Sequence, residues 1–129
     1  MPGGERRAPY LCGQLYATLE ALSVIGTGGA GMARPEEVRR AMQPPRTVLL
    51  RHLRAVGEHL HLAVRRSPAH AEAAAEVFAA IPGFVPAGGL PAGNLGVAEA
   101  AEFTAGYEAQ RSVYEEKHGP LMRRAGRAP

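Results

Sequence analysis

The sequence contains no aspartate and no tryptophan, and only one lysine and one cysteine. Because Cys12 is the only cysteine, no disulfide can form within the chain, which fits a reducing compartment. No apolar run approaches the ~20 residues of a membrane-spanning helix, and no apolar signal segment follows the first residues. We therefore expect a soluble, cytoplasmic protein without a membrane partner.

Aromatic residues are also scarce, at 5% of the 129 residues, so leucine, valine and alanine must form most of the core. The alternation of period two that predicts β-strands is missing, whereas apolar residues recur at helical spacing. We predict an all-α bundle, one domain over residues 9–118, with a flexible leader over 1–8 and a basic flexible tail over 119–129. Its four long helices are expected over 9–25, 46–66, 68–81 and 97–118, and its one short helix over 35–43.

Local signals support these boundaries. Pro9 suits a first helical turn and Gly26 a C-terminal stop, while Ser67 and Pro68 suit the N-cap and first position of a helix. Each long helix carries a stripe that we expect to be buried. The stripes are Leu11, Leu15, Leu19 and Leu22; Leu49, Leu53, Val56, Leu60 and Ala63, widened by Leu50 and Val64; Ala71, Ala74, Phe78 and Ile81; and Phe103, Tyr107 and Tyr114.

The stretch GTGGAG, residues 26–31, has the G-x-G-x-x-G spacing of dinucleotide-binding loops. That fingerprint works only where it leaves a buried strand and opens a helix. Here it follows a predicted helix, and no strand precedes it. We interpret it as a flexible hinge and expect no nucleotide cofactor.

The remaining candidates for chemistry are histidines and nucleophiles. His59 and His61 point about 200° apart on a helix, and His52 and His59 share a face without an aspartate or nearby cysteine to complete a metal site. No serine or cysteine lies in a recognisable nucleophile motif. We expect neither a metal site nor an enzyme.

Charge is the stronger lead. Residues 1–66 carry ten arginines and five glutamates, whereas residues 67–118 carry seven glutamates against Arg111 and Lys117. Arginines along helices match phosphates and give salt-sensitive, sequence-independent binding, with little base stacking where rings are few. Equally, the arginines could pair with the acidic last helix inside the bundle, and the sequence leaves both possibilities open. The candidate nucleic-acid-binding residues are Arg39, Arg40, Arg46, Arg51, Arg54, Arg65 and Arg66.

Three segments carry a resemblance to a known family: YLCGQLYATLE (10–20), VLLRHLRAVGEHL (48–60) and FTAGYEAQR (103–111). They resemble the C-terminal helical region of the large subunit of type I-C CRISPR Cascade complexes, a region that is also translated separately as the small subunit. The matching positions are Tyr10, Gly13, Leu15, Leu19 and Glu20; Val48, Arg51, Leu53, Arg54, His59 and Leu60; and Phe103, Gly106, Tyr107, Gln110 and Arg111.

The resemblance implies a non-catalytic helical subunit that stacks along the effector complex and steadies the R-loop through contacts with the non-target strand. Its implied partners are the large subunit, the backbone subunits, further copies of itself, and the backbone of target DNA or guide RNA. Arg51 and Arg54 are matched positions, whereas the other five arginines are added from charge alone. GTGGAG and the short helix depart from the family pattern, and LPAGNLG (90–96) follows it loosely.

We expect a free-standing small subunit rather than a fragment of a large one. The alternative from a different class is a helical protein-interaction or dimerising adaptor module, whose basic face meets an acidic partner.

Overall fold

The computed structural model describes residues 7–29 and 31–122, and these contain helices and no strand, so the all-α prediction is confirmed. Within them, no helix is both long and apolar enough to cross a membrane. The elements are α1 (Ala8–Thr27), α2 (Pro35–Arg40), α3 (Pro45–Leu53), α4 (Val56–Arg66), α5 (Pro68–Ala80), the 3-10 helix η1 (Ile81–Phe84), α6 (Val97–His118) and the 3-10 helix η2 (Gly119–Met122).

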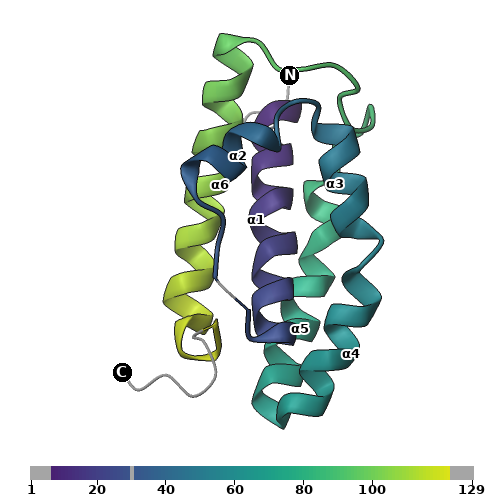
Figure 1. Ribbon diagram of the computed structural model, residues 1–129, viewed down its shortest axis with the longest axis vertical. Helices are drawn as coiled ribbons and strands as arrows, with labels where there is room; N and C mark the ends of the chain where they lie inside the picture. The colour runs from purple at the N-terminus through teal and green to yellow at the C-terminus, as the bar shows by residue number, and fades with distance from the viewer. Residues whose placement is uncertain (1–6, 30, 123–129) are drawn as a thin grey trace.

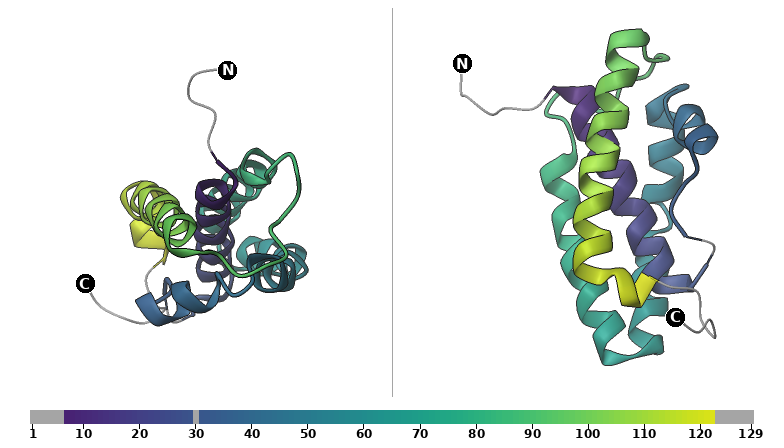
Figure 2. Two further views of the ribbon diagram at one scale, coloured as in Figure 1. Left: turned by 90° about the horizontal axis from the view of Figure 1, so that it is seen from above. Right: turned by 90° about the vertical axis from the view of Figure 1, so that its left-hand side faces the viewer.

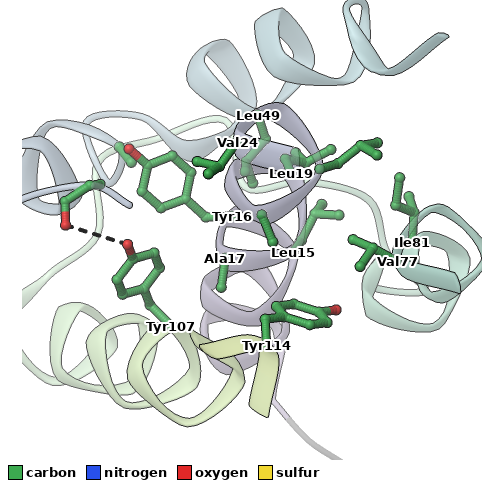
Figure 3. Packing of buried hydrophobic residues seen from close by; sticks show 14 of the residues in the cluster. Leu15, Tyr16, Ala17, Leu19, Val24, Leu49, Val77, Ile81, Tyr107 and Tyr114 are labelled. Carbon is green, nitrogen blue, oxygen red and sulfur yellow. Dashed lines mark hydrogen bonds between the residues drawn. The ribbon is translucent and has the colours of Figure 1, made fainter. Parts of the chain in front are cut away.

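Helix α1 is the centre of the bundle. It packs against α6 on one side and against α3, α4 and α5 on the other (Figures 1 and 2). The predicted stripe of Leu15, Leu19 and Leu22 is buried as expected, although Leu11 is only half-buried. Thr18, which lies off that stripe, is also fully buried. A helix with neighbours on several sides is buried well beyond a single stripe, which the stripe prediction did not anticipate (Figure 3).

Helices α1 and α6 touch through their backbones. A Cβ atom added to Gly13 would lie 2.0 Å from the carbonyl oxygen of Phe103, and one added to Gly106 would lie 2.1 Å from that of Tyr10. Only glycine allows an approach this close. Gly13 and Gly106, both matching positions of the resemblance, therefore have a packing role on opposite sides of one helix crossing.

The helix predicted over 46–66 is two helices, which corrects the sequence analysis. It breaks at Arg54 and Ala55, where the amide of Ala55 bonds to the carbonyl oxygen of His52 at 3.0 Å instead of reaching one residue further back. α3 and α4 each pack on α1, and they bury Leu49 and Ala63 completely. We attribute the break to these contacts and to the weak helix propensity of the nearby Gly57.

Two predicted core positions of α3 and α4 are wrong. Leu50 is 38% exposed and Val64 is 57% exposed, because only the face of α3 and α4 that meets α1 is covered. Phe78 on α5 is likewise 40% exposed, and the buried residue in its place is the adjacent Val77. The other predicted residues Leu53, Val56 and Leu60 are partly buried against the core.

The helix ends differ in how well they were predicted. Ser67 caps α5 as expected, since its hydroxyl accepts the amide of His70 at 3.0 Å. Gly26, in contrast, does not end α1: it lies inside the helix, where an added Cβ would be 2.3 Å from the carbonyl oxygen of His59 in α4. The stop is Gly28, whose φ of 69° is left-handed and whose amide bonds to Val24 at 2.9 Å.

The packed domain also extends beyond the predicted limit at residue 118. α6 ends at His118 as predicted, but η2 follows it directly and buries Met122. The rest of the predicted basic tail, and residues 1–6 of the predicted leader, lie outside the described residues. Of the stretch GTGGAG, Gly26 and Thr27 form the end of α1 and Gly28 is its C-cap, and the described part of the chain contains no strand before it, which the dinucleotide fingerprint requires.

Candidate nucleic-acid interface

The seven candidate arginines lie on α2, α3 and α4 or at their ends, and α3 and α4 flank α1 opposite α6 (Figure 1). Most of them occupy last helical turns: Arg39 and Arg40 in α2, Arg51 in α3, and Arg65 and Arg66 in α4. A cation there is stabilised by the negative end of the helix dipole. Local helix electrostatics thus accounts for where these arginines sit along the chain.

Five of the arginines are exposed and have no ion-pair partner. Among residues 7–29 and 31–122, the ion pairs are Arg7 with Glu102, Arg111 with Glu115, and Glu76 with Lys117 and His118. None of these involves a guanidinium of α2, α3 or α4, so pairing of the arginines with α6 inside the bundle is not observed. The five are Arg39, Arg40, Arg51, Arg54 and Arg65.

Arg46 and Arg66 have partners within the chain instead. An Nη of Arg66 donates to the carbonyl oxygen of Ile25 at 2.7 Å, and its guanidinium lies over Gly28, so it caps the end of α1. The Nε of Arg46 donates to Leu90 at 3.2 Å, and its backbone amide donates to Pro91 at 3.0 Å. These bonds hold the segment before α6 against the start of α3. The candidate set therefore divides into five solvent-facing arginines and two that stabilise the fold.

The five do not form one compact patch. Arg40 and Arg51 line the same cleft, whereas Arg39 lines a neighbouring depression beside Arg111 of α6. Arg65 lies fourteen residues beyond Arg51, in the last turn of α4. The five exposed arginines are therefore spread over three helices, from α2 to the end of α4.

The cleft that Arg40 and Arg51 line is formed by α1, α2 and α3 and has a volume of about 380 Å³. It combines two arginines with two carboxyl groups and two rings. The residues that define it here are Tyr16, Glu20, Glu37, Arg40, Arg51 and His52. We call it the α2–α3 cleft.

Glu20 is the unusual group in the α2–α3 cleft. Burial raises its pKa to about 7, and the negative charge of Glu37 adds to the rise. Hydrogen bonds from the backbone of Ala33 and the hydroxyl of Tyr16, together with the charge of Arg111, act against it. Near neutral pH this carboxyl group therefore exists in both protonation states.

His52 and Tyr16 form the aromatic part of the cleft. Their rings meet edge to face, with centroids 5.7 Å apart. Burial lowers the pKa of His52, and the adjacent Arg51 lowers it further, so the imidazole is neutral near pH 7. Burial raises the pKa of Tyr16, and the Glu20 charge adds to this effect, so its hydroxyl remains a hydrogen-bond donor.

Arg111, a matching position of the resemblance, forms hydrogen bonds within the chain. One Nη donates to the carbonyl oxygen of Ala33 at 3.3 Å, and its Nε donates to Glu115 at 2.9 Å. The hydroxyl of Tyr107 also donates to Ala33, at 3.4 Å, as the dashed line in Figure 3 marks. These contacts anchor the segment that enters α2.

The sequence alone does not predict the cleft. Glu20 is a matched position of the resemblance, but neither Glu20 nor Tyr16 belongs to the buried stripe predicted for that helix. A signal was present, because Tyr16 and Glu20 are four residues apart on a mostly apolar helix and therefore share a face. That spacing does not show, however, that α2 and α3 approach this face of the helix.

Two further observations bear on function. Among the described residues, no group of three or more His, Cys or Glu side chains is arranged to hold a metal ion. The chain matches no protein-family model, no curated protein and no solved structure. The resemblance to the Cascade subunit is therefore carried by the three sequence segments alone.

Proposed function

We propose that the chain is a non-catalytic small subunit of a cytoplasmic type I CRISPR effector complex, similar to that of type I-C, and contacts the nucleic-acid backbone of the R-loop. The observation that carries the proposal is the set of five arginines on α2, α3 and α4 that are exposed and have no ion-pair partner within residues 7–29 and 31–122. Unpaired guanidinium groups on a rigid helical surface suit phosphate binding, because no internal ion pair must be broken first.

Arg51 and Arg54 are the leading contacts. They are the two arginines that belong to the resemblance, and both are exposed next to the junction of α3 and α4. Arg51 also lines the α2–α3 cleft, and Arg54 follows it by three residues. A strand bound across the junction of α3 and α4 would contact both.

Exposed apolar residues lie beside the same arginines. Leu50 precedes Arg51 and is 38% exposed, and Val64 precedes Arg65 and is 57% exposed. Apolar area next to guanidinium groups also favours contact with protein. It supports neighbouring Cascade subunits as partners, and it equally supports the second candidate function, a helical adaptor module that binds an acidic protein.

The deciding experiment adds the chain to a guide-loaded type I-C effector core that lacks its small subunit. The proposed function requires that the chain co-elute with the core and lengthen the lifetime of the R-loop. If the chain neither joins a cognate core nor changes that lifetime, the proposal is wrong, and a search for an acidic protein partner becomes the next step.

A salt titration of single-stranded DNA binding then tests the arginines. The slope of log K against log salt is about −0.7 per neutralised phosphate on a single strand, so Arg51→Ala/Arg54→Ala should flatten it by about 1.4. The matched control is Arg7→Ala/Lys117→Ala, which removes the same charge from residues that are ion-paired with Glu102 and Glu76. An equal change in both variants would show an effect of net charge without a specific contact.

A further inference from the structure

The α2–α3 cleft has features that backbone binding does not need. Backbone contacts require exposed cations, but the floor of this cleft includes the half-buried carboxyl group of Glu20 on α1. Glu37 supplies a second carboxyl group, and the exposed Arg40 and Arg51 also line the cleft. Acceptors and cations are thus combined in one cleft, as a ligand with both a donor edge and a phosphate requires.

The size and chemistry of the cleft suit a nucleotide. Its volume of about 380 Å³ lies within the range of about 300–1,000 Å³ that is usual for ligand sites. A carboxylate has about four acceptor positions, and the hydroxyl of Tyr16 and the backbone of Ala33 donate to that of Glu20. Acceptor capacity therefore remains for a ligand.

Among the bases, guanine presents two adjacent donors, N1–H and the N2 amino group, on its Watson–Crick edge. A carboxylate accepts both at once, whereas adenine and cytosine offer one donor beside an acceptor on that edge. The arginines can hold the attached phosphate or stack on the base, as guanidinium planes do in single-stranded recognition. Guanine is thus the base that matches an ionised Glu20.

We propose that the α2–α3 cleft binds a guanine nucleotide, with Glu20 accepting the donor edge of the base and Arg40 and Arg51 holding the adjoining phosphate. This inference rests on the proposed function, because it names the part of a bound strand that enters the cleft. A guanine turned out of the strand at this point would fix the register of the strand on the exposed arginines.

The first test uses free nucleotides, so that binding by the cleft is separated from binding along the arginines. In ¹H–¹⁵N spectra of the chain, 5′-GMP should shift amide signals around the cleft, and 5′-AMP should bind at least about fivefold more weakly, the lower limit for one bidentate pair. Glu20→Gln should remove the difference between GMP and AMP. Equal shifts with GMP and AMP, or shifts that Glu20→Gln leaves unchanged, would overturn the proposal.

A second variant covers the possibility that Glu20→Gln perturbs the fold. Thr47 lines the cleft from an exposed position on α3, so Thr47→Trp should fill the cleft while Glu20 itself is not substituted. It should abolish the GMP shifts while the helical circular dichroism is retained. A matched control, Thr104→Trp, places the same ring beside the separate depression near Arg111 and should leave GMP binding intact.

The strand is tested with oligothymidines that carry one dG, one deoxyinosine or one abasic site at the same position. The dG strand should bind at least about fivefold more tightly than the abasic strand, with deoxyinosine, which lacks the N2 amino group, in between. Salt-sensitive binding that is identical for all three strands, without GMP shifts, overturns the cleft and leaves the proposed function standing. If the chain bound none of the three strands but still preferred GMP to AMP, the result would support guanine binding by the cleft and contradict backbone binding by the isolated chain.

Discussion

On one side of α1, the backbone of α6 lies so close that two glycines are needed at the crossing, and the charged groups of α6 include Glu102, Glu115 and Lys117, all of them ion-paired. On the other side, α3 and α4 are two short helices with half-buried leucines, and the arginines there have no carboxylate partners among the described residues. On the α6 side, these three charged groups are paired within the chain. On the α2–α4 side, five exposed arginines have no such partner within the described residues.

This contrast separates the residues that stabilise the fold from those available for binding. Arg66 on α4 and Arg111 on α6 bond to backbone carbonyls and so belong to the fold. Arg51 and Arg54 do not. Substitutions on the α6 side should therefore change stability, and substitutions of the exposed arginines should change binding alone.

The largest expected effect comes from the α1–α6 crossing. Gly106→Ala places a methyl group 2.1 Å from the carbonyl oxygen of Tyr10, and the obstacle is backbone that no side-chain rotation can relieve. We expect a loss of about 3 kcal/mol or more in the free energy of unfolding, measured by urea denaturation. Gly93→Ala is the control, because nothing lies within 4 Å of its added Cβ. A similar small effect in both variants would mean that α1 and α6 are not in backbone contact.

The second effect, on the α2–α4 side, depends on pH. Since the folded pKa of Glu20 is raised to about 7 from 4.5, its contribution to stability is lost as pH rises between these values and stays constant above them. The free energy of unfolding of Glu20→Gln should equal that of the wild type near pH 4.5. At pH 8 it should be about 2 kcal/mol higher than that of the wild type, allowing for partial exposure of the carboxyl group. Thermal melts across this range give the difference directly.

Other groups near Glu20 bear on that measurement. Glu37 and Arg111 act on it through charge, and Arg40, Arg51 and His52 line the same cleft. The control is therefore Glu108→Gln, an exposed carboxyl group on α6. A pH-dependent gain of the same size in the control would assign the effect to net charge instead of to the buried position of Glu20.

These two predictions also mark what the sequence could reveal. The boundaries of α5 and α6 were predictable because local signals decide them, such as the Ser67 cap and Pro68. The break at Arg54 and Ala55 was not, since both residues tolerate helix and the contacts of α3 and α4 with α1 decide the path. The α2–α3 cleft was hidden for the same reason: its walls come from three segments that only the tertiary fold brings together.

The burial of polar residues in α1 was equally hard to foresee. Thr18 does not belong to the predicted stripe, yet it is fully buried, and its hydroxyl lies 2.7 Å from that of Tyr114. A polar residue can enter a core when a partner satisfies it, and the partner here is 96 residues distant in sequence. Arg51 and Arg54, in contrast, lie outside the predicted stripe and are exposed.

A smaller effect on the α6 side is expected from that buried pair. The Thr18 hydroxyl donates its single hydrogen to the backbone carbonyl oxygen of Gln14 at 2.8 Å, so the hydroxyl of Tyr114 is the donor to Thr18. Tyr114→Phe removes this donor while the ring still fills its place, and we expect a loss of about 1 kcal/mol in the free energy of unfolding. A Tyr114→Phe variant as stable as the wild type would show that the buried bond does not hold α1 to α6.

The smallest expected effect is an increase in stability, and it concerns the α2–α4 side. Gly57 lies in the first turn of α4, it is exposed, and nothing lies within 4 Å of an added Cβ. Gly57→Ala should therefore raise the free energy of unfolding by about 0.5 kcal/mol, because alanine favours helix and restricts the unfolded chain. The same glycine-to-alanine change thus has opposite signs on the two sides of α1. A loss of stability at Gly57 would mean that α4 is packed as closely as α6, and the division of the bundle into a stabilising side and a binding side would then fail.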